Sequence, residues 1–98
     1  MENKYKLTNE TTNINKITLY RIEALKDFSD VKKGDKGGFV QSEDNLSHER
    51  NCWIYDDAKV YGRARIYGNA IVGGNAEVFG NARIYDNSLI LTEPHYTA

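Results

Sequence analysis

Residues 53–88 read WIYDDA, KVYGRA, RIYGNA, IVGGNA, EVFGNA and RIYDNS when this stretch is divided into blocks of six. The second residue of each block is Ile or Val, and the third is usually aromatic. The fourth residue is Gly or Asp, and the sixth is Ala or Ser. A period kept through consecutive blocks indicates a repeat architecture, so the fold prediction starts from this stretch.

A period of six residues fits a short strand followed by a turn. The β-branched second residue suits a strand, and Gly-Asn or Asp-Asn supplies the left-handed backbone that a sharp corner needs. Three such sides would close a triangle, so residues 18 apart would lie on parallel strands stacked roughly 4.8 Å apart. A repeat of five residues with four sides is a poor competitor, because no period of five is present. The predicted inward residues of this stretch are Ile54, Val60, Ile66, Val72, Val78 and Ile84, with the alanine that ends each of the first five blocks.

Length and composition limit the alternatives. A chain of 98 residues is expected to form one domain. Its net charge of −1 gives no argument for nucleic acid or membrane binding. The single cysteine, Cys52, excludes an internal disulfide and fits a reducing compartment. No apolar run has the length of a membrane span and the N-terminus has no signal-peptide core, so we expect a cytoplasmic protein.

The remaining segments are predicted to cap the repeat. Residues 2–8 and 17–25 are interpreted as the two strands of a hairpin, with a helix as the alternative for 17–25 because its apolar residues recur every third position. Residues 26–38 are expected to form a loop. The predicted organisation is therefore a hairpin and loop cap over 1–38, a hexapeptide repeat over 39–94 and a tail over 95–98.

The segment before the repeat carries a recognisable series of short motifs. They are Asp27-Phe28, Asp30-Val31-Lys32, Gly34-Asp35, Gly37-Gly38-Phe39, Asn45-Leu46-Ser47 and Cys52-Trp53-Ile54-Tyr55. Together with the repeat, they resemble uncharacterised hexapeptide-repeat proteins of enterobacteria, phages and prophages, some of which are labelled transferases from their fold. The resemblance implies an all-β fold: a left-handed parallel β-helix of about three 18-residue coils with an N-terminal β-hairpin cap.

Two outward faces of the predicted prism are candidate binding surfaces. One face is apolar and is interpreted either as a self-association surface or as the seat of the N-terminal hairpin. Its residues are Trp53, Tyr55, Ile71, Leu89 and Leu91. The other face stacks arginine on arginine and tyrosine on tyrosine, residue types enriched at binding hot spots. Its residues Arg65, Tyr67, Arg83 and Tyr85 are the candidate site for an acidic protein partner, with a solvated face as the alternative.

The sequence offers little for catalysis. Acyltransferases of the resembled family use a histidine base on coenzyme A thioesters, whereas the histidines here are His48, before the regular repeat, and His95, after Pro94. No Ser–His–Asp, CxxC or HExxH arrangement is present, and Cys52 falls at an inward position. We therefore predict no catalytic residue, no cofactor and no metal.

The expected function is a non-catalytic protein-binding module. The phage resemblance implies action on host machinery, for example inhibition of a defence system such as a CRISPR effector in the host cytoplasm. The alternative is an acyltransferase-like enzyme that uses an acyl thioester. We expect a protein partner and a homo-oligomer, either dimer or trimer, with nucleic acid as the weaker partner and no membrane.

Overall fold

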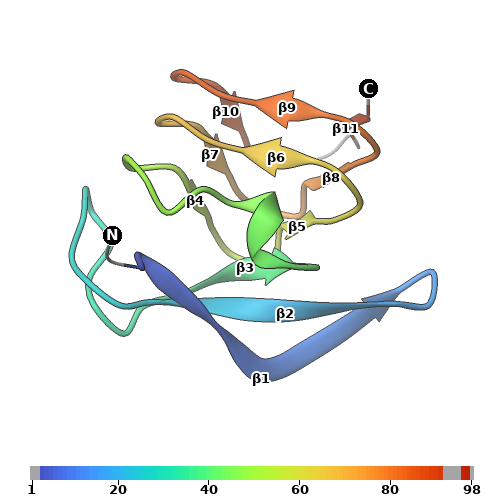
Figure 1. Cartoon of the computed structure of the whole chain (residues 1–98), viewed down its shortest axis with the longest axis horizontal. Coiled ribbons are helices and arrows are strands. Elements are labelled where there is room, and N and C mark those ends of the chain that lie inside the picture. Colours follow the sequence, from blue (N-terminus) through green and yellow to red (C-terminus); the bar gives the residue numbers. More distant parts are fainter. Residues whose placement is uncertain (1–2, 92–95, 98) are drawn as a thin grey trace.

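The computed structural model describes residues 3–91 and 96–97, and these residues form short strands with one 3₁₀ helix (Figure 1). The first strands are β1 (Tyr5–Ile14), β2 (Ile17–Ala24) and β3 (Lys36–Val40), followed by the helix η1 (Glu43–Asn45). The later strands are β4 (Trp53–Ile54), β5 (Lys59–Val60), β6 (Arg65–Ile66), β7 (Ile71–Val72), β8 (Glu77–Phe79), β9 (Arg83–Ile84), β10 (Leu89–Ile90) and β11 (Tyr96–Thr97). Within the described residues, no helix is long and apolar enough to span a membrane.

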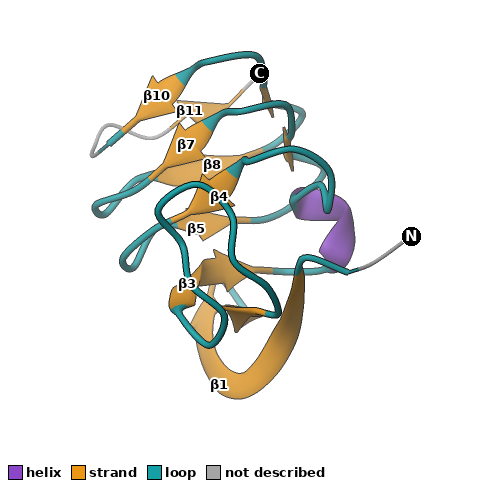
Figure 2. Ribbon diagram, turned by 90° about the vertical axis from the view of Figure 1, so that its left-hand side faces the viewer, coloured by secondary structure: helices purple, strands orange, loops and turns teal. Residues whose placement is uncertain are grey.

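The strands belong to three sheets. The largest has the order β1-β2-β3-β5-β8-β11, the second has the order β10-β7-β4, and the third pairs β6 with β9. Figure 2 shows β4, β7 and β10 stacked in one column, with β5, β8 and β11 in another behind it. The largest sheet is mixed, because β1, β2 and β3 pair antiparallel whereas β3, β5, β8 and β11 pair parallel.

The predicted fold, a left-handed parallel β-helix of about three 18-residue coils with a separate hairpin cap, is wrong. The chain is all-β, but its largest sheet is mixed and contains the hairpin. The hairpin joins this sheet because the backbone groups on both edges of β3 need hydrogen-bond partners. Strand β2 pairs with one edge of β3, and β5 pairs with the other. Residues 41–52 contain η1 and turns rather than repeat strands.

The spacing of 18 residues between paired strands is confirmed from β4 onward, whereas β3 pairs with β5 at a spacing of 20 residues, Phe39 with Lys59. Lys59 pairs with Glu77 and Val60 with Val78 in the largest sheet. The other two sheets show the same spacing, from β4 to β7 to β10 and from β6 to β9. Residues at equivalent positions of the repeat therefore lie side by side.

Each corner of the repeat uses the fourth residue of the block. Its backbone is left-handed, as the glycine or aspartate there predicts. The residues and their φ angles are Asp56 (58°), Gly62 (68°), Gly68 (67°), Gly74 (63°), Gly80 (69°) and Asp86 (56°). A Cβ atom on Gly68 would also lie 2.8 Å from the backbone nitrogen of Asp86, so the corners stack closely.

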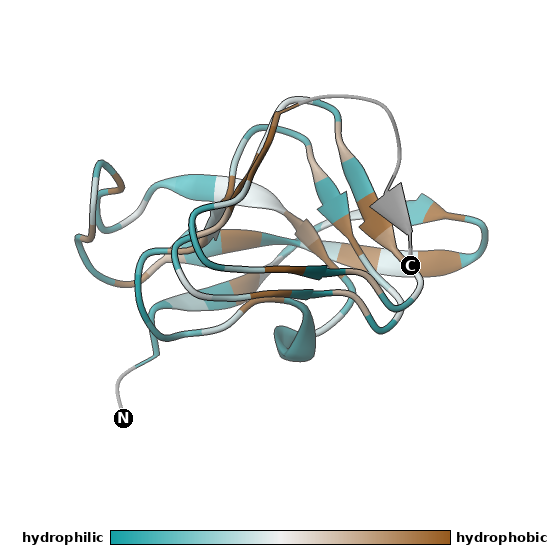
Figure 3. Cartoon of the chain, turned by 90° about the horizontal axis from the view of Figure 1, so that it is seen from above, coloured by the Kyte–Doolittle hydropathy of each residue, from teal (hydrophilic) through white to brown (hydrophobic). Residues whose placement is uncertain are grey.

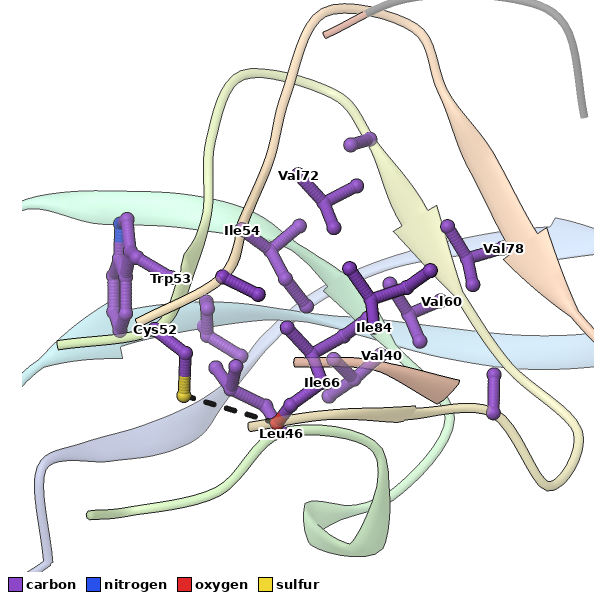
Figure 4. Packing of buried hydrophobic residues seen from close by; sticks show 14 of the residues in the cluster. Val40, Leu46, Cys52, Trp53, Ile54, Val60, Ile66, Val72, Val78 and Ile84 are labelled. Carbon is purple, nitrogen blue, oxygen red and sulfur yellow. Dashed lines mark hydrogen bonds between the residues drawn. The ribbon is translucent and has the colours of Figure 1, made fainter. Parts of the chain in front are cut away.

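The predicted inward residues are buried, which confirms this part of the sequence prediction. Ile54, Val60, Ile66, Val72, Val78 and Ile84 are at most 9% exposed, as are Ala58, Ala64, Ala70, Ala76 and Ala82. Figure 4 shows the Ile and Val side chains converging on one interior. Seen from above, the strands surround this interior, with the hydrophilic turns at its outside (Figure 3).

The N-terminal hairpin is longer than predicted. Residues 9–14, which lie between the two predicted strands 2–8 and 17–25, belong to β1, and β1 shifts its pairing between Leu7 and Thr11. The turn lies at Asn15 and Lys16, whose φ angles are 49° and 70°. The division into segments 1–38, 39–94 and 95–98 stays a prediction, and residues 92–95 and 98 lie outside the described residues.

Candidate partner-binding surface

The outward residues of β6 and β9 form two short columns. Arg65 pairs with Arg83 across the two parallel strands, and both side chains are exposed. Tyr67 and Tyr85, which follow the strands, stack with their ring centroids 5.3 Å apart and their planes 11° apart. Because Ile66 and Ile84 point inward and are buried, side-chain alternation turns these charged and aromatic residues outward.

The helix η1 forms a wall beside these columns. Asn45 is buried and donates from Nδ2 to the carbonyl oxygens of Gly62 (3.3 Å) and Ala64 (2.8 Å). Its Oδ1 accepts from the backbone N–H of Gln41 and of Ser42, each at 3.0 Å. A single amide thus anchors the helix to the corner that precedes β6.

Two hollows lie between η1 and the β6–β9 pair. The first, of about 390 Å³, is lined by Arg63 and Asn81 as well as by Arg65 and Arg83. The second, of about 400 Å³, is lined by Glu43, His48 and Tyr67 in addition to the same two arginines. Asp44 lines both hollows, so the shared boundary carries two arginines and one aspartate.

Positive charge dominates the first hollow. Among the described residues, Arg63, Arg65 and Arg83 take part in no ion pair, whereas Arg21 bonds to Glu10 at 2.8 Å and to Asp57 at 3.0 Å. The arginines of the hollow therefore keep their donors available, and each guanidinium can hold a carboxylate or phosphate by paired hydrogen bonds.

His48 is held by its surroundings. Its Nδ1 accepts from the backbone N–H of Lys4 (3.0 Å), its Nε2 lies 2.7 Å from a carboxylate oxygen of Glu43, and its ring stacks on Tyr5 at 4.2 Å. Accepting at Nδ1 assigns the proton to Nε2, which donates to Glu43. With both nitrogens engaged, His48 ties the N-terminus to η1.

The apolar candidate face is covered at one end. Trp53 is 1% exposed, and its ring meets Phe28 edge to face at 5.2 Å and Tyr5 at 6.2 Å. The hydroxyl of Tyr55 donates to Asp30 (2.7 Å), and burial together with this bond raises the pKa of Tyr55. The segment at 28–30, rather than the hairpin strands alone, covers this end.

The other end of that face is open. Ile71 is half-buried, whereas Leu89 is 58% exposed and Leu91 is 54% exposed. Gly73 lies between the Tyr55 and Leu91 side chains, since a Cβ atom there would be 3.4 Å from each. The five apolar candidates are thus divided between a buried part and an exposed part of the face.

Lys4 is a buried residue that the sequence analysis missed. Its ammonium donates to the carbonyl oxygens of Cys52 (2.6 Å) and Arg50 (3.2 Å) and lies 3.4 Å from Sγ of Cys52. Burial lowers the pKa of Lys4 and raises the pKa of the Cys52 thiol. The partners of Lys4 are more than 40 residues away in the chain, so no local pattern indicates them.

Arg63 and Asn81 were also missed as surface candidates, although the sequence holds an indication. Both occupy the fifth position of their blocks, and they are 18 residues apart. Applying the same spacing to the corner positions as to the strand positions would have placed them together. Among the described residues, no group of three or more His, Cys, Asp or Glu side chains could hold a metal ion.

Comparison with known proteins gives a partial match. No family model matches the chain. A stretch of 44 residues is 43% identical to a curated protein. That protein is the uncharacterized acetyltransferase YdcK of Escherichia coli strain K12. The match covers 45% of this chain and 14% of YdcK, so the chain spans a small part of that protein's length. The similarity gives partial support to the transferase-like hexapeptide-repeat resemblance.

Proposed function

We propose that the chain is a non-catalytic protein-binding module that contacts its partner through the face of β6 and β9. The observation that carries the proposal is the arrangement of Arg65, Tyr67, Arg83 and Tyr85, which lie side by side on the surface and form no ion pair among the described residues. Arginine and tyrosine contribute strongly to protein interfaces, because each combines a large contact area with hydrogen bonding.

A second candidate function is acyl transfer, favoured by the similarity to a protein named as an acetyltransferase. Of the two histidines, His48 is the one that the structure describes, and it is the candidate base considered for this reaction; His95 lies outside the described residues. A general base needs a nitrogen free to accept a proton from the substrate. Nδ1 of His48 already accepts from Lys4, and Nε2 faces Glu43. This geometry favours the binding module over the enzyme.

The finer parts of the proposal come from the sequence resemblance. They are action on host machinery, such as inhibition of a CRISPR effector, and self-association as a dimer or trimer. The exposed Leu89 and Leu91 are the residues through which we propose the self-association.

The test combines capture with an activity assay. The immobilised protein is expected to retain one partner from bacterial lysate in stoichiometric amount, and Tyr67→Ala/Tyr85→Ala should lose that partner while keeping its fold. Incubation with acetyl-coenzyme A should release no thiol above the level of a His48→Gln variant. Thioester turnover that requires His48, without any captured partner, would replace the binding module by the enzyme.

A further inference from the structure

The first hollow has an unequal distribution of charge across it. Arg63, Arg65 and Arg83 line one side, and Asp44 lies on the helix that forms the other side. All three arginines are exposed. Because positive and negative side chains lie on opposite sides of the hollow, an anionic group is attracted to the strand side and a backbone N–H to the helix side.

The carboxylates of η1 favour an acidic peptide over a nucleic acid strand as the ligand of this groove. Asp44 and Glu43 are exposed carboxylates of that wall, and both line the second hollow. A nucleic acid strand carries a phosphate at every residue, so its continuous charge would pass these carboxylates. A peptide carries carboxylates only on some side chains and offers backbone N–H donors between them, so it can meet both walls.

Given the proposed function, we infer that the groove between η1 and the β6–β9 pair binds an acidic segment of the partner protein, whose carboxylates are held by Arg63, Arg65 and Arg83. Tyr67 lines the second hollow and its ring stacks on Tyr85, so the two rings extend the contact surface beside the arginines. Asn45 holds the helix wall in place before binding, because its Oδ1 accepts from the residues just before η1 and its Nδ2 donates to the corner before β6.

The experiment is an NMR titration of the ¹⁵N-labelled protein with a blocked peptide of alternating glutamate and glycine. The matched probe is the same peptide with glutamine in place of glutamate, and an oligothymidylate of equal charge is the third probe. The glutamate peptide is expected to shift the amides of 42–45, 63–65 and 81–83, and the shifts should shrink as salt is added. The glutamine peptide should leave these amides unchanged.

Variants assign the effect to the arginines. Each single Arg→Gln substitution at 63, 65 or 83 should lower the affinity for the glutamate peptide about two- to fivefold, which is the effect of losing one exposed ion pair. The triple variant Arg63→Glu/Arg65→Glu/Arg83→Glu should abolish the shifts. Arg50→Glu is the control, since Arg50 is an exposed arginine that lines neither hollow.

The outcomes separate this inference from the proposed function. The inference of an acidic-peptide groove would be overturned if the glutamine peptide bound as tightly as the glutamate peptide or if the oligothymidylate bound more tightly. Loss of the amide shifts in the Arg50→Glu control would also overturn it. A captured partner that binds the triple variant as tightly as the wild type would also overturn it, while leaving the binding module intact. Absence of any captured partner would remove the proposed function, and the titration would still decide whether the groove holds acidic peptides.

Discussion

The face of β4, β7 and β10 and the face of β6 and β9 are built from equivalent positions of one repeat, yet their side chains differ in exposure. At the covered end of the first face, Trp53 is 1% exposed beneath Phe28 and Tyr5, whereas Tyr85 on the second face is 47% exposed. The segment that precedes the repeat makes this difference. A position in the repeat therefore fixes the direction of a side chain, and the rest of the chain decides whether that side chain is available to a partner.

The largest expected effect comes from removing the anchor of the covered face. Trp53→Ala should lower the free energy of unfolding by about 3–5 kcal/mol, because a fully buried indole leaves a cavity. Tyr85→Ala should cost about 1 kcal/mol, the contribution of its stacking on Tyr67. Urea unfolding of both variants measures the difference, and equal losses would mean that the two faces are equally covered.

A smaller effect is expected at the N-terminal attachment of the covered face. Lys4→Met should cost roughly 1–3 kcal/mol, because the carbonyl oxygens of Cys52 and Arg50 lose their buried donor. Lys6→Met, an exposed lysine of the same segment, is the matched control and should change stability by less than about 0.5 kcal/mol. Urea midpoints that coincide for the two variants would show that the ammonium of Lys4 does not attach this segment.

The stability of the protein should depend on pH through the bond between Tyr55 and Asp30. Its folded-state pKa is raised above the ordinary value of 10.0, so the bond to Asp30 is fully present below that pH and is lost as the pH rises through the folded pKa. Tyr55→Phe should cost about 1 kcal/mol at neutral pH and should reduce the loss of stability above pH 10. An unchanged alkaline loss of stability in Tyr55→Phe would contradict this role.

The smallest effect is expected on the open face. Arg65 and Arg83 are like charges on directly opposite residues, an arrangement that opposes folding slightly. Arg83→Gln should therefore raise the free energy of unfolding by roughly 0.2–1 kcal/mol at low salt, and added salt should remove the gain. Destabilisation by Arg83→Gln at low salt would show that this arginine serves the fold rather than a partner.

The sequence predicted the interior well because the interior follows local rules. Val60 and Val78 are buried at the expected spacing, and Gly62 takes the left-handed backbone of a corner. These features depend on alternation and turn chemistry within a few residues.

The prediction of the fold class was wrong because it depends on contacts between distant segments, which local sequence patterns do not indicate. The antiparallel pairing of β2 with β3 joins the hairpin to the largest sheet, and this contact forms between segments that the sequence separates by a loop. The burial of Trp53 by Phe28 and the burial of Lys4 beside Cys52 depend on similar distant contacts. The surface prediction found Arg65 and Arg83 but missed Arg63, because Arg63 occupies a corner of the repeat and the outward strand positions alone do not indicate it.

The most direct test of the difference between the faces is the dissociation constant of the captured partner for two double variants. Tyr67→Ala/Tyr85→Ala removes the rings of the open face, and Leu89→Ser/Leu91→Ser removes the exposed leucines at the end of the other. We predict that the tyrosine variant loses about thirtyfold in affinity, near 2 kcal/mol, while the leucine variant stays within about twofold. Wild-type affinity in the tyrosine variant together with loss in the leucine variant would contradict the assignment of the partner surface to β6 and β9.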